Sequence, residues 1–82
     1  MTTLLFIRHG IAEDWRPGLP DSERGLTEEG WTKTRKAMRG ILARGLVPSR
    51  GISSPYRRAM ETMACLKEEA MELDPAHAFP VG

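Results

Sequence analysis

The distribution of apolar and polar positions along the chain predicts two strands and two helices. Residues 3–8 are mostly apolar and do not alternate with polar ones, which is typical of a strand buried on both faces of a parallel sheet. Residues 27–44 and 55–72 each place apolar side chains on one helical face. We expect a short second strand at residues 50–53. This order of elements predicts an α/β fold, a parallel sheet with flanking helices joined by right-handed crossovers.

Residues at the ends of the two helices agree with these boundaries. Thr27 is a good N-cap for the first helix, and Gly45 can end it. Ser54 can cap the second helix, with Pro55 at its first position. A proline two residues beyond Leu73 cannot continue a helix, so the second helix should end near Leu73.

The length of 82 residues allows one small domain. Two strands are too few for a parallel sheet, which needs both faces covered. We therefore expect residues 1–82 to be the N-terminal portion of a single domain, comprising its first β-α-β-α part, and not a stable monomer alone. The rest of the fold, or a second copy that associates through the exposed sheet edge, should supply the cover.

Composition and charge are those of an ordinary globular protein. The net charge of +1 gives no electrostatic case for nucleic acid or an anionic membrane as a partner. The N-terminal apolar run is too short to span a membrane and lacks the basic flank of a signal peptide. A single cysteine, Cys65, cannot form an intrachain disulfide and is expected to be a small buried apolar residue. These features favour a cytoplasmic protein.

Chemically suggestive residues follow both predicted strands. Arg8, His9 and Gly10 end the first strand, and Arg58 lies in the first helical turn after the second. Because ligands of open parallel sheets bind beyond the carboxyl ends of the strands, we expect these residues to surround one phosphate, beside a helix N-terminus. A neutral imidazole is a competent nucleophile toward phosphorus. Gly10 would let the backbone approach a substrate and leave room for a main-chain acceptor to hold the ring.

Three segments at this spacing resemble the histidine phosphatase superfamily, which includes phosphoglycerate mutases. They are Arg-His-Gly at residues 8–10, "RGLTEEG" at residues 24–30 and "SPYRRAMET" at residues 54–62. The resemblance covers roughly residues 3 to 65 and implies a three-layer α/β/α fold.

The resemblance also implies the roles of individual residues. His9 would be the phosphorylated nucleophile, and Arg8 and Arg58 would bind the phosphoryl group together with Gly10. Arg58 is the matching arginine because it immediately precedes an alanine, so Arg57 is expected to face elsewhere. Two guanidiniums and a helix N-terminus can balance phosphoryl charge, so we expect neither a metal nor another cofactor.

The branch of the family follows from the residues after the glycine. Mutases and their close relatives usually have Glu or Gln and then Thr or Ser there, whereas this chain has Ile11 and Ala12. The chain is therefore more similar to SixA-like phosphohistidine phosphatases, which implies a phosphorylated protein as partner. Two alternatives stay open: a phosphoglycerate mutase-like phosphatase or mutase acting on a small phosphorylated substrate, and a non-catalytic phosphate-binding fragment.

The chain departs from the family in one respect. The second histidine of the family pocket, usually in a Gly-His pair, does not occur in these 82 residues, and His77 lacks that context. An acidic proton donor is not evident either. Glu13 and Asp14 could reach the site from their loop, but such acids are more often solvated.

Some of these residues also have plain structural interpretations. Asp21 and Arg24 are expected to brace the loop that contains them. Arg58 could instead form a salt bridge on the helix surface, with Glu61 or Glu29 as its partner.

Overall fold

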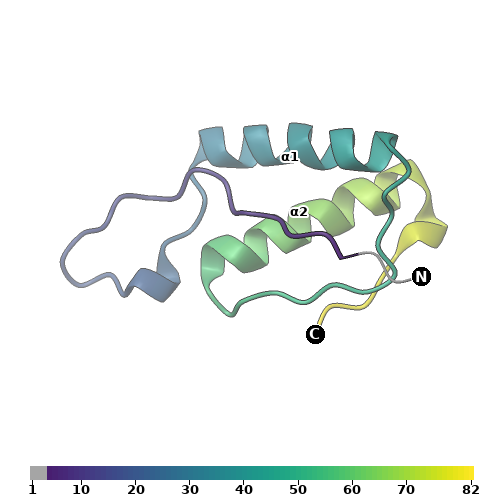
Figure 1. The fold of residues 1–82 in the computed structure, drawn as a ribbon. Helices are drawn as coiled ribbons and strands as arrows, with labels where there is room; N and C mark the ends of the chain where they lie inside the picture. The colour runs from purple at the N-terminus through teal and green to yellow at the C-terminus, as the bar shows by residue number, and fades with distance from the viewer. Residues whose placement is uncertain (1–3) are drawn as a thin grey trace.

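Two α-helices form the body of the computed structural model, which describes residues 4–82 (Figure 1). They confirm the two helices predicted from the sequence. The helices and the two short 3-10 helices have the following bounds: η1 Asp21–Glu23, α1 Glu28–Ala43, α2 Arg57–Leu73 and η2 Pro75–His77.

Helix α1 has the ends that the sequence predicts. The hydroxyl oxygen of Thr27 accepts the N–H of Gly30 at 3.0 Å, which satisfies one of the free donors in the first turn. Gly45 follows the helix at φ 79° and donates its N–H to the carbonyl of Leu42 at 2.9 Å. This left-handed conformation strains any residue with a Cβ, so glycine is favoured here.

The predicted N-cap of the second helix is wrong. Tyr56 takes that position without a side-chain cap, because its ψ of 137° keeps the backbone extended until Arg57. Ser54 instead accepts the N–H of Tyr56 at 3.3 Å, one turn ahead of the helix. The other end agrees with the prediction, since α2 ends at Leu73.

The predicted parallel sheet is also wrong. Residues 4–82 contain no strand and only two isolated bridges, an antiparallel one between Ala12 and Leu26 and a parallel one between Gly51 and Val81. Residues 4–8 of the first predicted strand form none of these bridges, and residue 3 lies outside the described residues. The side chain of Phe6 is 90% exposed. Two short extended segments cannot cover each other's faces, so the pattern that predicts a buried strand is not satisfied in this chain.

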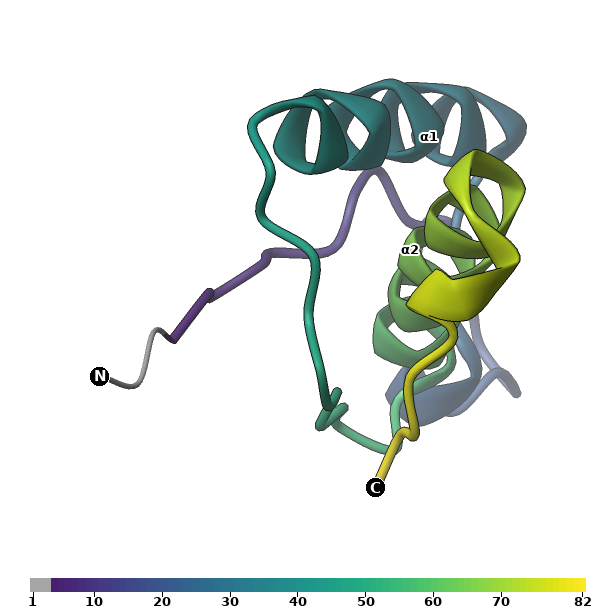
Figure 2. The ribbon, with the colours of Figure 1, turned by 90° about the vertical axis from the view of Figure 1, so that its right-hand side faces the viewer.

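The two extended segments lie on the same side of the helix pair (Figure 2). Residue 51, in the second predicted strand, pairs with the C-terminal tail and not with the first. The N–H of Gly51 donates to Pro80 at 2.8 Å, and the N–H of Gly82 donates to Gly51 at 2.8 Å. No adjacent parallel pair of predicted strands therefore forms. Self-association through a sheet edge stays a prediction. It assumed a sheet with an exposed edge, which residues 4–82 do not form.

The hydrophobic core lies between α1, α2 and the tail. Its buried members, from both helices and the tail, are Met38, Leu42, Cys65, Leu66, Ala70 and Phe79. Cys65 is fully buried, as the sequence predicts, and burial raises the pKa of its thiol. No helix in the described part of the chain is both long and apolar enough to cross a membrane.

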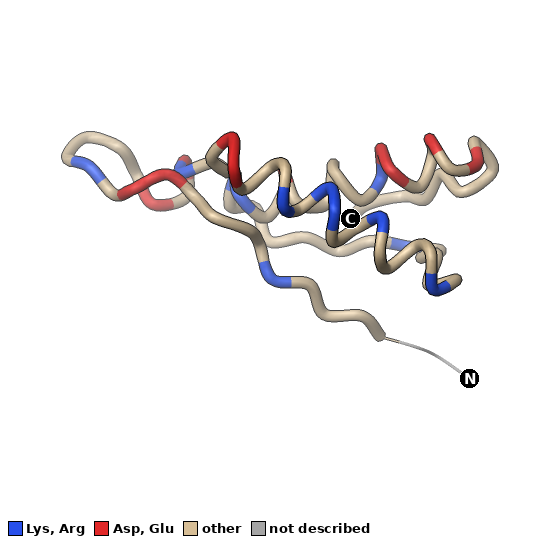
Figure 3. The backbone as a smooth tube through the Cα atoms, turned by 90° about the horizontal axis from the view of Figure 1, so that it is seen from above, with Lys and Arg blue, Asp and Glu red and all other residues tan. Residues whose placement is uncertain are grey.

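A buried carboxylate joins the two helices. Basic residues are distributed along α1, and acidic residues are concentrated in the second half of α2 (Figure 3). Glu69 of α2 is only 4% exposed, and it accepts hydrogen bonds from Arg39 at 2.8 Å and from Arg35 at 3.3 Å. The hydrogen bond from Arg39 is the main reason why the pKa of Glu69 lies below its usual value. The contact therefore stabilises the helix pair more strongly when Glu69 is ionised than when it is protonated.

Replacing this carboxylate should weaken the helix pair. We expect Glu69→Gln to destabilise the chain by about 1 kcal/mol. This is less than is typical for charged hydrogen bonds, because the side chains of Arg39 and Arg35 are 64% and 40% exposed. Because the pKa of Glu69 is lower in the folded state, its contribution should be complete above about pH 4.5, the ordinary value, and should fall below it. Circular dichroism during urea titration at several pH values measures both effects.

The matched control is Glu72→Gln, which removes the same charge from an exposed position on α2. Equal urea midpoints for the two variants at neutral pH would contradict the role given to Glu69.

Candidate functional site

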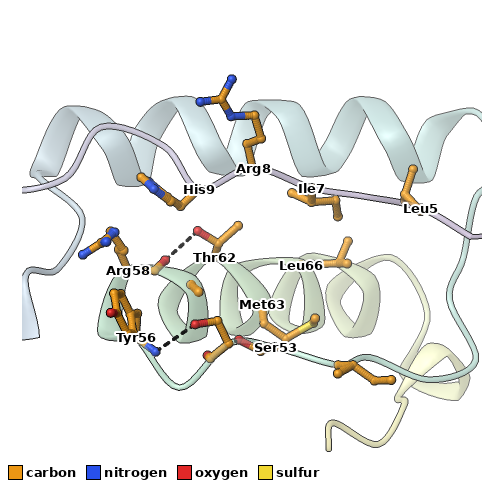
Figure 4. A pocket seen from close by; sticks show the side chains of 13 residues that line it. Leu5, Ile7, Arg8, His9, Ser53, Tyr56, Arg58, Thr62, Met63 and Leu66 are labelled. Atoms are coloured by element: carbon orange, nitrogen blue, oxygen red, sulfur yellow. Dashed lines mark hydrogen bonds between the residues drawn. The ribbon is translucent and has the colours of Figure 1, made fainter. Parts of the chain in front are cut away.

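A pocket of about 390 Å³ lies between the N-terminal extended segment, residues 52–54 and the first half of α2 (Figure 4). Its apolar lining includes Leu5, Ile7, Ile52, Met63 and Leu66. Most of the polar lining comes from Arg8, His9, Ser53, Ser54 and Arg58. Arg8, His9 and Arg58 therefore line one pocket, although the predicted strands do not form. Gly10, the fourth residue expected there, is not part of the lining.

The imidazole of His9 has a main-chain partner. Its Nδ1 lies 2.8 Å from the carbonyl oxygen of Gly10. A proton on Nδ1 would donate to this oxygen, which leaves the lone pair on Nε2. A ring held in this way, with its proton on Nδ1, would be oriented for nucleophilic attack by Nε2.

Two glycines let the segment after His9 lie directly on the first turn of α1. A Cβ on Gly10 would stand 2.6 Å from the hydroxyl of Thr34, and a Cβ on Gly30 would overlap the carbonyl oxygen of Ile11. That oxygen accepts the N–H of Thr27 at 2.8 Å. The position of His9 is therefore tied to the N-terminus of α1 by backbone contacts that only glycine permits.

Arg58 reaches the same end of the pocket as His9 (Figure 4). Its side chain is only 13% exposed, and its guanidinium lies 4.8 Å from the centre of the Tyr56 ring. Its Nη1 donates to the carbonyl oxygen of Asp21 at 2.7 Å, and its Nη2 donates to Oδ2 of Asp21 at 3.0 Å. The guanidinium is therefore held on two sides.

Asp21 also contacts Arg24, so one carboxylate lies between two arginines. Its Oδ1 accepts from Nη1 of Arg24 at 2.7 Å, and Nε of Arg24 donates to the carbonyl oxygen of Glu13 at 2.7 Å. The hydrogen bond from Arg24, followed by the one from Arg58, lowers the pKa of Asp21 below its usual value. Asp21 and Arg24 brace the loop as expected.

The sequence did not indicate the contact between Asp21 and Arg58. The expected surface partners of Arg58 have other contacts: Glu61 pairs with Arg57 at 3.6 Å and accepts the N–H of Leu26, and Glu29 pairs with Lys33. Asp21 and Arg58 are 37 residues apart, so no local periodicity relates them.

The guanidinium of Arg8 points away from Arg58, although Arg8 lines the same pocket (Figure 4). The structure therefore places His9 and Arg58 at the same end of the pocket, whereas the guanidinium of Arg8 is directed away from both (Figure 4).

The remaining candidates lie outside the pocket lining. His77 is in η2 beside Asp74, at 3.7 Å. The carboxylate of Glu13 accepts the N–H of Gly25 at 3.1 Å, and Asp14 is exposed. Within residues 4–82, no group of three or more His, Cys, Asp or Glu side chains is placed to hold a metal ion.

Residues 4–78 match the sequence profile of the histidine phosphatase superfamily, branch 1. An uncharacterized protein of Picosynechococcus is 38% identical over 72 residues, which are 88% of this chain and 42% of that protein.

Two crystal structures are similar in fold. The first is of the putative phosphohistidine phosphatase SixA from Agrobacterium tumefaciens, with a TM-score of 0.79, 22% identity and coverage of 93% of this chain and 46% of that chain. The second is of the putative phosphohistidine phosphatase SixA from Nakamurella multipartitia, with a TM-score of 0.58, 22% identity and coverage of 92% and 53%. The chain thus spans about half the length of the proteins it matches.

The contact between Gly30 and Ile11 can be tested with one methyl group. We expect Gly30→Ala to displace residues 10–12 and to shift the NMR signals of His9 and Gly10, because the new Cβ overlaps the Ile11 carbonyl. It should also lower the urea midpoint of unfolding.

Gly40→Ala is the matched control, since Gly40 is in the same helix and nothing lies within 4 Å of its new Cβ. This variant should stabilise the chain by roughly 0.5–1 kcal/mol through helix propensity. If Gly30→Ala behaved like Gly40→Ala and left the His9 signals in place, the close contact would not be what positions His9.

Proposed function

Because the chain belongs to the histidine phosphatase superfamily, we propose that this protein is a phosphatase that acts through a phosphohistidine intermediate on His9. The observation that carries this proposal is the shared pocket end of His9 and Arg58, with Nδ1 of His9 held by the Gly10 carbonyl oxygen. Nucleophilic catalysis needs an oriented lone pair, and phosphoryl transfer needs fixed cations around the equatorial oxygens.

In the proposed reaction, Nε2 of His9 attacks phosphorus in line. The bond from nitrogen to phosphorus forms as the bond to the leaving group breaks. The ring becomes cationic, and its Nδ1–H continues to donate a hydrogen bond to the Gly10 carbonyl oxygen. Arg58 holds the equatorial oxygens, and the exposed side chain of Arg8 turns toward them when substrate is bound. Water then cleaves the phosphoryl group from His9 and releases phosphate.

We further propose a phosphohistidine of a protein as the substrate. An imidazole leaving group needs little acid assistance, which agrees with the engagement of Glu13 in a backbone hydrogen bond of its own loop. Two structures of similar fold are named as putative phosphohistidine phosphatases, which supports this choice. We also propose a cytoplasmic location, because the only cysteine is a buried free thiol.

A non-catalytic phosphate-binding role is the second candidate. It is favoured by the absence of a second histidine in a Gly-His pair from these 82 residues. The two functions differ in their need for His9: a binding protein would hold inorganic phosphate through its arginines and turn over no substrate. A mutase-like activity on small substrates would show instead as turnover of small phosphate monoesters in preference to phosphohistidine.

Three single substitutions test the proposed phosphatase. We expect His9→Ala to abolish release of phosphate from a phosphohistidine peptide, because no other imidazole lines this pocket. Arg58→Ala should lower kcat on the order of a hundredfold or more, as for loss of one fixed transition-state donor.

The matched control is Arg57→Ala, which removes the same charge one position earlier from a surface ion pair with Glu61. Arg57→Ala should lower kcat only slightly. Full activity of His9→Ala, or strict dependence on an added divalent metal, would falsify the mechanism.

A further inference from the structure

We propose that Asp21 is a positioning residue for Arg58: it holds the guanidinium so that the free N–H donors of Arg58 face the phosphoryl group bound at His9. This inference rests on the proposed function. It assigns a role in the reaction to the loop between the first extended segment and α1.

The contact from Asp21 to Arg58 is made at two points of one residue. The carbonyl oxygen accepts from Nη1 at 2.7 Å, and the carboxylate accepts from Nη2 at 3.0 Å. A guanidinium has five N–H donors in a rigid plane, so this contact uses two of them and leaves three for a ligand. Two hydrogen bonds from one rigid plane also fix its rotation, which a single ion pair would leave free.

A second contact comes from Tyr56, whose ring centre lies 4.8 Å from the guanidinium. In the absence of a ligand, the Arg58 side chain is therefore already restrained by contacts with Tyr56 and with Asp21 of the loop. Ordering an arginine side chain costs free energy because the side chain loses rotamer freedom. A side chain that is already ordered does not pay this cost again when the ligand binds.

Asp21 is itself fixed, which makes it suitable for this role. It begins η1, its second carboxylate oxygen accepts from Arg24 at 2.7 Å, and Arg24 is bound to the Glu13 carbonyl. The two arginines also hold the pKa of Asp21 below its usual value, so the carboxylate is ionised at neutral pH. One carboxylate between two arginines leaves this group with net positive charge, which suits a phosphoryl anion.

A contrasting interpretation is that Asp21 competes with the phosphoryl group for Arg58. In that case removing the carboxylate would tighten the binding of inorganic phosphate and would not slow the reaction. Under our proposal the phosphoryl group meets the free donors while Asp21 stays in place. Loss of the Asp21 carboxylate should then lower mainly kcat, because a mobile Arg58 guanidinium is not held where charge develops in the transition state.

The test combines kinetics on a phosphohistidine peptide with nitrogen-15 NMR of the Arg58 guanidinium, assigned with Arg58→Lys. In the wild-type protein we expect separate, slowly rotating Nη signals. Asp21→Ala should average them and lower kcat about tenfold with KM within about twofold, less than the roughly hundredfold loss from a 1 Å misplacement. Asp21→Asn keeps one amide oxygen as an acceptor but places an NH2 donor where the second carboxylate oxygen was, so its kcat should lie between those of the wild type and Asp21→Ala. This intermediate loss tests the inference even if Asp21→Ala fails to fold.

Glu23→Ala is the matched control. Glu23 lies in the same turn of η1 with an exposed side chain, and no ion pair is seen for it among residues 4–82. Unchanged kcat in Asp21→Ala, tighter inorganic phosphate binding without loss of kcat, or an equal loss in Glu23→Ala would each overturn the inference. Averaged Arg58 signals in the wild-type protein would overturn it whatever the activity. An inactive wild-type protein with restrained Arg58 signals would overturn the proposed function alone.

Discussion

The backbone contact between residues 10–12 and the first turn of α1 determines where His9 can lie. The carbonyl oxygen of Ile11 occupies the space that a side chain at residue 30 would fill, and it accepts the N–H of the helix cap Thr27. Glycine at residues 10 and 30 is a steric requirement of this crossing. The histidine is therefore positioned by the first turn of α1, even though the segment before it is extended and largely exposed.

The loop that follows this crossing connects His9 to the second half of the pocket. Its residues contact the first turns of α2 through Asp21 and Arg58 and through the N–H of Leu26, which donates to Glu61 at 2.7 Å. The core and the Glu69 contact hold α1 against α2. The two helices, the loop and the crossing thus form a closed set of constraints, with His9 and Arg58 at one end of the pocket it encloses.

The helices could be predicted from the sequence because their signals are local. Apolar spacing, the cap at Thr27, the left-handed Gly45 and the proline beyond Leu73 all act within a few residues of the features they determine. The Ser54 cap could not be judged in this way, because the following proline and tyrosine keep the backbone extended.

The strands and the Arg58 contact depend on residues far away in sequence. A run such as residues 4–7 reads as a buried strand only if neighbours cover it, and in this structure Phe6 and Ile52 are 90% and 76% exposed. The tail contains two residues that are unfavourable in strands, Pro80 and Gly82, yet its backbone pairs with Gly51. Asp21 could be read as a loop brace, but its contact with Arg58 required the fold.

We propose that His9 and Arg58 form a phosphoryl-transfer site with Nε2 of His9 as the nucleophile. The most direct measurement is rapid-quench trapping with a phosphorus-32-labelled phosphohistidine peptide, followed by mass-spectrometric mapping of the labelled residue. We expect a transient phosphoryl adduct on His9 that is labile in acid and stable in base. A label on any other residue, or turnover with no protein-bound label at times shorter than one catalytic cycle, would contradict it.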